Sequence, residues 1–263
     1  MTDNPKKITI WLNEIHDTFS FIISNTKSPS CKEAIILLNN EDVFEKLLAV
    51  YFYDPKLIRT DTDIRDAVSL WCSDRTTAIQ KYGNISIWDV SNVTNMNGLF
   101  KGYHSFNDDI SKWDVSNVTT MEKMFNGAHI FNQPIGDWDV SNVTTMSYMF
   151  HCAFYFNQYI GDWDVSNVTT MAAMFYATDF NKYIGNWDVS NVTNMQEMFE
   201  GANKFNQNIG NWNVSNVINM FRMFHGAHAF NQNIGDWPVS NIRFYRDGMF
   251  DGCPIIGENM PKR

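Results

Sequence analysis

Long apolar runs are missing from this 263-residue sequence. No segment approaches the roughly 18 consecutive apolar residues that a membrane-spanning helix requires, so we expect no membrane span. The first residues show no secretory signal, because the apolar core of such a signal is lacking. Basic charge is also scarce, since 20 Lys and Arg stand against 29 Asp and Glu and leave a net charge of −9. Phosphate binding needs clustered Lys and Arg, so the composition argues against a nucleic-acid partner.

Cysteine is scarce, and catalytic signatures are missing. The four cysteines, Cys31, Cys72, Cys152 and Cys253, are far apart and form no C-x-x-C pair, so we expect reduced thiols. The sequence contains no G-x-S-x-G, no phosphate-binding P-loop, no H-E-x-x-H and no dinucleotide fingerprint. We therefore expect a protein that is not an enzyme, with no catalytic residue, no metal and no cofactor.

What the sequence does contain is one short motif, repeated. The letters W-D-V-S-N-V-T-T-M begin at Trp113, Trp138 and Trp163. Self-similarity at a fixed period of this length predicts a stacked repeat array. Seven copies fill the chain from about Ile85 to the C-terminus. Their tryptophans are separated by 25, 25, 25, 24, 25 and 25 residues and are Trp88, Trp113, Trp138, Trp163, Trp187, Trp212 and Trp237.

Each copy carries two apolar patterns. The segment from Asp137 to Ser141 alternates polar and apolar residues, which predicts a strand with one buried face. Met146, Met149 and Phe150 follow at spacings i, i+3 and i+4, which predicts a short helix. One parallel strand and one short helix per ~25 residues predict an α/β repeat, a leucine-rich-repeat-like solenoid.

The single short spacing falls in the fourth copy. The letters M-F-Y-A at Met174 lack the glycine that is present in M-F-N-G-A at Met124. We therefore expect one residue to be lost at that turn, with the strand and core positions staying in register. Cys152 occupies the same glycine column, and Cys253 occupies the alanine column that follows it.

These residues resemble a known repeat. Seven copies of W-D-V-S-N-V-x-x-M, each followed by M-F-x-G-A-x-x-F-N-Q-x-I-G or a close variant, are similar to the BspA-like surface-protein repeat over roughly Asp63 to Asp251. That repeat is often labelled a domain of unknown function and occurs in bacterial surface lipoproteins and in proteins of large DNA viruses. The resemblance implies a right-handed leucine-rich-repeat-like solenoid, adhesion to host proteins in some bacterial members, and no catalytic residue. Because no lipoprotein signal is visible, the viral or intracellular members are the better comparison, and we expect an intracellular or virion-associated protein.

The first 84 residues differ from the repeats. Residues 1–54 contain helical patterns, with a capping box at Ser30 opening one helix. In residues 55–84, apolar residues spaced from Ile64 predict a helix from about Asp63 to Gln80, N-capped by Thr62. We expect this helix to cover the first coil of the solenoid, residues 85–263, as the terminal caps of repeat arrays do. The segment 1–54 either extends the cap or forms a docking module.

Carboxylates recur at two outward positions of the repeat. Stacked ~4.8 Å apart, like charges repel by about 1 kcal/mol per pair in water. In one interpretation, each Asp accepts hydrogen bonds from backbone N–H or serine groups at the bend. In the other, the acidic strand face binds a basic partner or divalent cations, while catalysis by paired carboxylates is disfavoured because every copy is alike. The first column holds Asp89, Asp114, Asp139, Asp164 and Asp188 and continues as Asn213 and Pro238; the second holds Asp137, Asp162, Asn186, Asn211 and Asp236.

Three further columns have a structural and a ligand-binding interpretation. Methionines from Met96 to Met220 are expected in the core rather than on a soft metal such as Cu(I). Asparagines from Asn107 to Asn231 are expected to satisfy backbone groups at a tight bend rather than to bind a ligand. His104 and His129 are expected to be neighbours in a solvated loop rather than zinc ligands.

The sequence thus predicts a non-enzymatic protein-interaction or scaffold solenoid. Its protein partner is expected to bind the acidic strand face or the N-terminal helices. The alternative is a structural or adhesive component of a surface or a virus particle. The candidate binding residues are Asp89, Asp114, Asp139, Asp164, Asp188, Asp137 and Asp162.

Overall fold

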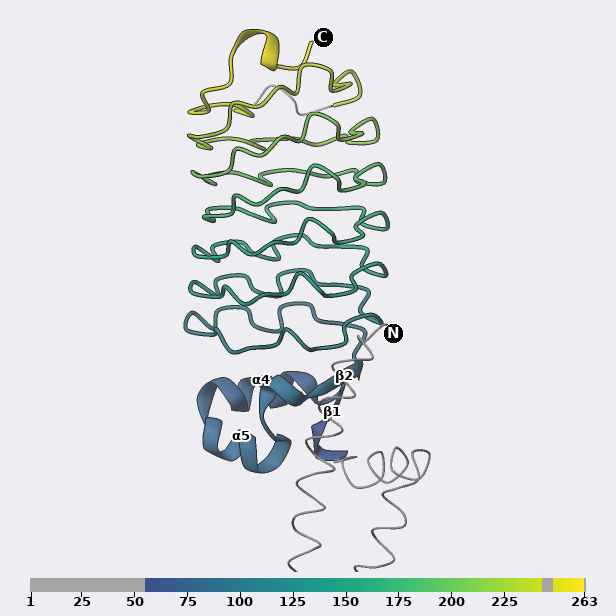
Figure 1. The fold of residues 1–263 in the computed structure, drawn as a ribbon, viewed down its shortest axis with the longest axis vertical. Helices are drawn as coiled ribbons and strands as arrows, with labels where there is room; N and C mark the ends of the chain where they lie inside the picture. Colours follow the sequence, from purple (N-terminus) through teal and green to yellow (C-terminus); the bar gives the residue numbers. More distant parts are fainter. Residues whose placement is uncertain (1–54, 243–247, 263) are drawn as a thin grey trace, which may run out of the picture. The chain divides into compact units, whose positions relative to one another are not determined.

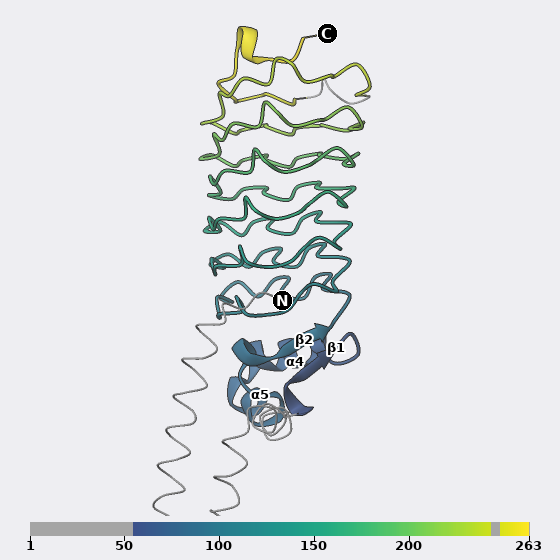
Figure 2. The same ribbon diagram turned by 45° about the vertical axis from the view of Figure 1, so that its right-hand side comes forward.

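The repeats lie one above another as successive coils of the chain (Figure 1). This computed structural model describes residues 55–242 and 248–262, so the helices expected in residues 1–54 lie outside the described residues. A view turned by 45° shows the same succession of coils (Figure 2). We number the coils 1 to 7 from their tryptophans, so that coil 3 begins at Trp138 and coil 4 at Trp163.

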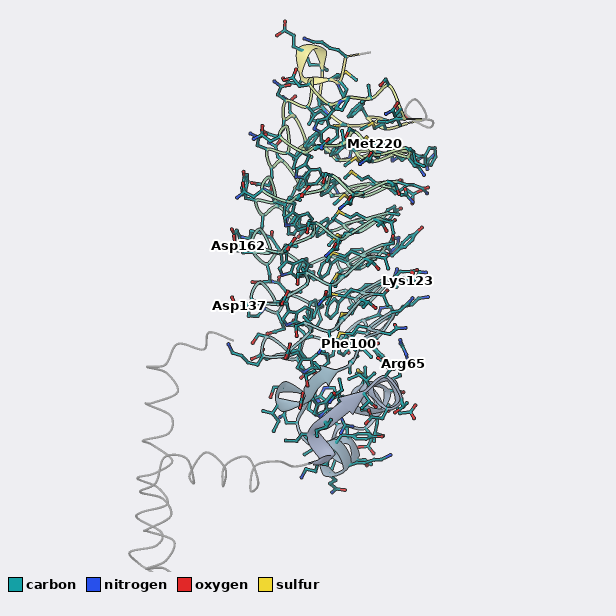
Figure 3. The ribbon with its side chains drawn as sticks, turned by 90° about the vertical axis from the view of Figure 1, so that its right-hand side faces the viewer. Arg65, Phe100, Lys123, Asp137, Asp162 and Met220 are labelled. Carbon is teal, nitrogen blue, oxygen red and sulfur yellow. The ribbon has the colours of Figure 1, made fainter. Side chains whose placement is uncertain are left out.

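The interior of the stack consists of apolar columns, each filled by one residue per coil. Met146 and Phe150 are completely buried, and Trp138 is only 4% exposed. The phenylalanines stack between coils, with ring centroids 5.7 Å apart for Phe125 and Phe150. Because no single coil can enclose these side chains, each one depends on its neighbours for burial. The methionine columns are therefore part of the core, and Figure 3 shows Phe100 and Met220 inside the stack.

Neighbouring coils are joined by parallel backbone hydrogen bonds. One parallel bridge links each pair of coils from coil 1 to coil 6, for example Thr120 with Thr145 and Thr145 with Thr170. The strand expected at Asp137–Ser141 differs from this arrangement, because the bridges fall several residues later. In that segment the Ser141 N–H donates to the Asp139 side chain and the Trp138 N–H donates to the Ile135 carbonyl. These donors are therefore not available to a neighbouring strand.

The segment expected to be a short helix is instead a series of turns. The Phe150 N–H donates to the Met174 carbonyl of the next coil at 3.0 Å, whereas an α-helix would direct it to the carbonyl of Met146. Tyr148 has φ of +58°, a left-handed conformation that interrupts a helix. In the turn from Met146 to Met149, the Met149 N–H donates to the Met146 carbonyl, and the left-handed residue is third, as in a type II turn.

The short coil, coil 4, still has a residue in the glycine column. Ala177 has φ of +53° and donates to the Glu200 carbonyl, just as Gly127 donates to the carbonyl of the next coil. The expectation that the missing residue is lost at this turn was therefore wrong, because Ala177 occupies the glycine's place in the same left-handed conformation. The missing residue lies after Thr178, where only Asp179 precedes the buried Phe180. Cys152, with φ of +57°, also occupies this column.

Within the described residues, two helices and one short strand precede the coils, and a second short strand lies at the start of coil 1. The strand β1 (Ile58–Thr60) follows a 3-10 turn, η1 (Pro55–Leu57), and pairs in parallel with β2 (Asp89–Asn92). The expected helix Asp63–Gln80 is two helices, α4 (Ile64–Ser73) and α5 (Arg75–Tyr82), because the Asp74 side chain caps a new N-terminus by accepting the Thr77 N–H. A 3-10 turn, η2 (Ile85–Ile87), leads into β2, and another, η3 (Gly257–Asn259), lies near the C-terminus. Within the described residues, no helix is both long and apolar enough to cross a bilayer.

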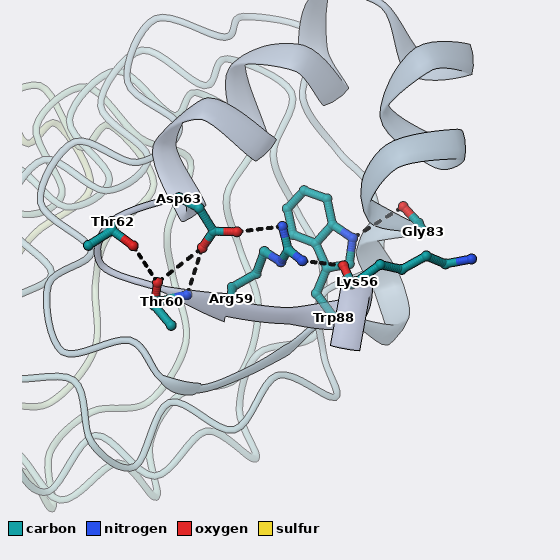
Figure 4. A network of polar contacts seen from close by, with 7 residues as sticks. All are labelled: Lys56, Arg59, Thr60, Thr62, Asp63, Gly83 and Trp88. Carbon is teal, nitrogen blue, oxygen red and sulfur yellow. Dashed lines mark hydrogen bonds and ion pairs between the residues drawn. The ribbon is translucent and has the colours of Figure 1, made fainter. Parts of the chain in front are cut away.

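A buried arginine fixes β1 against the helices (Figure 4). Arg59 is 2% exposed and donates to Asp63 at 2.7 Å. Its guanidinium also lies 4.6 Å from the ring centroid of Tyr82 and 5.5 Å from that of Trp88. Burial lowers the pKa of Arg59, and its contacts with Asp63 and the aromatic rings offset part of that cost.

The helices contact the first coil directly. Trp71 of α4 packs edge-on against Trp88, with ring centroids 6.0 Å apart. Arg65 donates to the carbonyl of Asn97 at 2.6 Å. The Asp61 side chain accepts the Thr94 N–H, a group that in later coils donates to the preceding coil. These contacts give the first coil partners on the side where it has no preceding coil.

Candidate functional site

We define the acidic face as seven of the eight aspartates in the two outward columns, leaving out Asp236 near the C-terminus. The Asp139 and Asp162 carboxylates, like the other five, are exposed to solvent. Figure 3 shows Asp137 and Asp162 on the side of the stack opposite to Lys123 and Arg65. These two aspartates therefore lie away from Lys123 and Arg65, although Lys112 occupies the same outward column in the coil before Asp137. The acidic face comprises Asp89, Asp114, Asp139, Asp164, Asp188, Asp137 and Asp162.

One oxygen of each first-column aspartate organises the local bend. In Asp139, Oδ1 accepts the Ser141 N–H at 3.0 Å and the Ser141 hydroxyl at 2.6 Å. The backbone bond recurs in all five copies at 3.0–3.1 Å. Side-chain and backbone hydrogen bonds from Ser190 lower the pKa of Asp188, because they favour its ionised form. The structural interpretation of this column is thus confirmed, and Asn213 makes the same two bonds at 3.2 and 2.8 Å.

The second oxygen of these aspartates is not used within the coil. Among the described residues, Oδ2 of Asp114, Asp139 and Asp164 accepts no hydrogen bond, and no aspartate of the acidic face forms an ion pair. Carboxylates elsewhere on the coils do have cationic partners, as Asp179 pairs with Lys204 at 2.7 Å. The acidic face therefore carries negative charge that the described residues do not neutralise.

The second column lies beside two tyrosines. The Tyr159 hydroxyl donates to Asp162 Oδ1 at 3.0 Å, and the Tyr183 hydroxyl donates to Asn186 Oδ1 at 3.2 Å. Both tyrosines are exposed, by 48% and 40% respectively. The repeat pattern did not indicate them, because the position they occupy differs from copy to copy.

A buried carboxylate lies on the turns of coil 5 and was also missed. Glu200 is 9% exposed, and its Oε1 lies 3.3 Å from Nδ1 of His225 and 3.9 Å from the guanidinium of Arg222. Its Oε2 is buried without a hydrogen-bond partner. Burial raises the pKa of Glu200, because desolvation disfavours the charged form. Glu200 occupies a column that also holds a histidine and a tyrosine, so no repeated signal marks it.

The asparagine and histidine columns have structural contacts. Asn132 Oδ1 accepts the Asn157 N–H at 3.0 Å, and the same bond recurs along the column at 2.9–3.0 Å, which confirms the backbone role. His104 and His129 stack with ring centroids 4.2 Å apart, so they are neighbours as expected. Within the described residues, no three His, Cys, Asp or Glu side chains are grouped so that they could hold a metal ion.

A pocket of about 200 Å³ lies between α4 and coil 1. Its walls include Trp71, Cys72, Tyr103 and Asp108. The Asp108 carboxylate accepts the Trp71 indole N–H of α4 at 2.9 Å and pairs with Arg75 of α5 at 2.6 Å, so it joins both helices to the coils. Burial raises the pKa of the Cys72 thiol to about 11, which keeps it protonated and a poor nucleophile at neutral pH.

The repeats match a known family model twice. The family is described as "Mycoplasma protein of unknown function, DUF285", and its model matches residues 72–182 and 155–262. Together the two matches cover well over half of the 263 residues. The chain belongs to this family. The matched DUF285 segments begin inside α4 and include all seven aspartates of the acidic face. No curated protein and no solved structure matched the chain.

Proposed function

We propose that this DUF285 protein is a non-enzymatic interaction module whose acidic face binds a basic protein partner. The observation that carries the proposal is the free Oδ2 of the first-column aspartates, repeated from coil to coil. Ser141 and its equivalents orient each carboxylate through Oδ1, so the second oxygen is presented without a large loss of side-chain freedom on binding. With a net charge of −9, the chain also attracts cationic partners over the screening length of the solution.

The fold proposed for this module is a right-handed leucine-rich-repeat-like solenoid of the BspA-like type. Three features support this proposal: the period of about 25 residues, the parallel bridges between coils and the column of asparagines at a bend. A regular solenoid suits an interaction module because its columns present one chemical group repeatedly at a constant spacing.

The proposal is tested by removing charge without changing the bend. Asp114→Asn, Asp139→Asn and Asp164→Asn in one chain should keep the fold, because Asn213 already forms the same hydrogen bonds. We expect this variant to lose a partner that the unchanged chain captures from a native lysate at low salt. A matched control neutralises three carboxylates off the acidic face, by Asp66→Asn, Glu122→Gln and Glu197→Gln, and should retain the partner.

Two results would contradict the proposal. Equal capture by the unchanged chain and the aspartate variant would exclude the acidic face as the binding surface. Equal loss from the variant and its control would show that net charge alone is responsible. A chain that lacks residues 1–54 tests the other proposed surface, the N-terminal helices, in the same experiment.

A second candidate is a structural or adhesive component of a surface or a virus particle. It is favoured by the resemblance of the W-D-V-S-N-V core to BspA-like repeats, which occur in surface lipoproteins and in viral proteins. In this version the chain is virion-associated, whereas the interaction module is intracellular. Recovery of the chain in purified particles or among exported proteins, with no partner captured from lysate, would support this second candidate.

A further inference from the structure

One outward position of the repeat holds a different type of side chain in the middle of the stack. In three coils a short polar side chain closes the local turn, as when Asn208 Oδ1 accepts the Gly210 N–H at 3.0 Å. Asn233 and Asp109 accept equivalent backbone N–H groups at 2.9 Å. In coils 3 and 4 the same position holds Tyr159 and Tyr183, whose side chains cannot close the turn in this way. The turn therefore does not require the tyrosines, and a short polar residue would suit it at least as well.

The two tyrosines are held against the surface in one geometry. A Cβ on Gly161 would lie 2.9 Å from the Tyr159 hydroxyl and 3.0 Å from its ring, so the ring crosses that glycine closely. Gly185 is crossed in the same way by Tyr183, with both distances 2.7 Å. At the far end, each hydroxyl donates to the side chain three residues later, Asp162 or Asn186. Since both ends of each ring are fixed, little side-chain entropy is lost when a ligand stacks on it.

We propose that Tyr159, Tyr183 and Asp162 form a recognition site for arginine side chains of a basic protein segment. This inference rests on the proposed function, because it names the residue type that the acidic face recognises. A guanidinium can stack on a tyrosine ring and pair with a neighbouring carboxylate at the same time. The Asp162 carboxylate accepts only the Tyr159 hydroxyl among the described residues, which leaves it able to accept N–H donors from a partner.

The surroundings hold more acidic than basic groups, with Lys182 as the neighbour of Tyr183 in the chain, and this balance favours a cationic occupant. Asp137 lies in the coil before this site, and Asp164 and Asp188 lie beside it in coils 4 and 5, all exposed and without an ion pair to a described residue. A neutral ligand stacked on the rings would leave these charges uncompensated, whereas a basic segment would neutralise several of them. Arginine suits the site better than lysine, because its planar group stacks and presents a fork of donors, whereas lysine is a strongly hydrated point charge.

The experiment measures the binding of an oligo-arginine peptide and of an oligo-lysine peptide of equal length to the full chain by calorimetry. The key variant carries Tyr159→Asn and Tyr183→Asn, which copy Asn208 and Asn233 and should preserve the turns. We expect the unchanged chain to prefer the arginine peptide. The variant should bind that peptide about 5- to 30-fold more weakly and should change little toward the lysine peptide. Tyr155→Asn is the matched control and should have no effect, because Tyr155 is 61% exposed and forms no hydrogen bond with an aspartate of the acidic face.

The outcomes separate this inference from the proposed function. Equal affinity for the two peptides, or unchanged arginine binding by the double tyrosine variant, would overturn the tyrosine site. If both peptides then still depended on Asp114, Asp139 and Asp164, the acidic face would stand without it. If neither peptide bound the unchanged chain, both proposals would be overturned. Binding of a neutral oligosaccharide that is lost in the tyrosine variant would show that the rings serve an uncharged ligand.

Discussion

In Asp139 and the equivalent aspartates of the first column, Oδ1 accepts hydrogen bonds within the coil, whereas Oδ2 of Asp139 accepts none from the described residues. Oδ1 of Asp139 accepts two hydrogen bonds from Ser141, so the residue is needed at the bend. Asn213 shows that the bend needs an acceptor oxygen but no negative charge. The carboxylate in five other coils is therefore more than the bend requires, which is the reason to look for its function outside the coil.

This division predicts different effects for two substitutions of Asp139. Asp139→Ala removes the acceptor for the Ser141 N–H and hydroxyl and should lower the free energy of unfolding by about 1 kcal/mol. Asp139→Asn keeps the acceptor and should change it by less than about 0.5 kcal/mol. Urea denaturation followed by tryptophan fluorescence measures both. Equal destabilisation by Ala and Asn would mean that the charge, and not the acceptor, supports the bend.

A pH-dependent effect is expected at Glu200. Its pKa in the folded chain lies above the ordinary 4.5, so the folded state binds the proton more tightly than the unfolded state. Ionised Glu200 therefore lowers the free energy of unfolding at pH values above its folded pKa, and this penalty disappears as the pH falls below 4.5. Glu200→Gln should raise the urea midpoint at pH 7, with the difference from the unchanged chain vanishing below about pH 4.

The control for this measurement is Glu258→Gln, at an exposed carboxylate. It should leave the pH dependence of the urea midpoint unchanged. A lower midpoint for Glu200→Gln at pH 7 would show that the contacts with His225 and Arg222 outweigh the cost of burial.

Among the elements, the turn series replaces the expected helix because its N–H groups alternate between two kinds of partner. Met149 donates within its own coil, whereas Phe150 donates to the next coil. An i, i+3, i+4 apolar pattern is satisfied by both a helix and this series, since each buries Met146, Met149 and Phe150. The pattern therefore predicted which side chains are buried but not the backbone that buries them.

The left-handed residues that precede the second methionine of each turn series, such as Lys123 and Tyr148, provide a test of the turn geometry. Lys123 has φ of +58°, which costs a non-glycine residue about 1–2 kcal/mol. Lys123→Gly should raise the free energy of unfolding by about 0.5–1 kcal/mol, because strain relief exceeds the added chain entropy. Lys123→Val should lower it, because a β-branched residue is disfavoured at positive φ.

Lys112→Gly is the matched control, since Lys112 is exposed and is not among the residues with positive φ. It should be neutral or destabilising in the same urea titration. Stabilisation by both glycines would attribute the effect to the loss of a lysine and not to backbone strain.

Across the whole stack, equivalent interfaces recur between coils. Removing Asp139 to Trp163 deletes one full period and joins Trp138 to Asp164, so coil 2 meets a partner with the same columns. The shortened chain should fold with a similar circular dichroism spectrum and a smaller dependence of unfolding on urea, in proportion to the buried surface lost. Removing Asp139 to Phe156 deletes an incomplete period and should abolish cooperative unfolding. Loss of folding in both chains would show that the coils are not interchangeable.

Much of the site could be predicted from the sequence, because residues one repeat period apart along the chain are neighbours in successive coils. The acidic face and the asparagine column were predicted from period alone, since residues such as Asn132 and Asn157 occupy the same place in successive coils. Tyr159, Glu200 and Arg59 were not predicted, because each departs from the repeat or precedes it. The repeat period therefore does not predict their contacts.

The sequence by itself determined the period, the buried columns, the outward carboxylates and the place of the cap before the first coil. These follow from local chemistry, because an apolar residue that recurs at a fixed period must be buried at the same place in each coil. Only the tertiary structure decided that the coils are joined by single bridges and turns, that α4 and α5 are separate helices, and that Ala177 takes the glycine's place. Those outcomes depend on where each backbone N–H finds its acceptor, and for half of the turn series the acceptor lies about 25 residues away on the next coil.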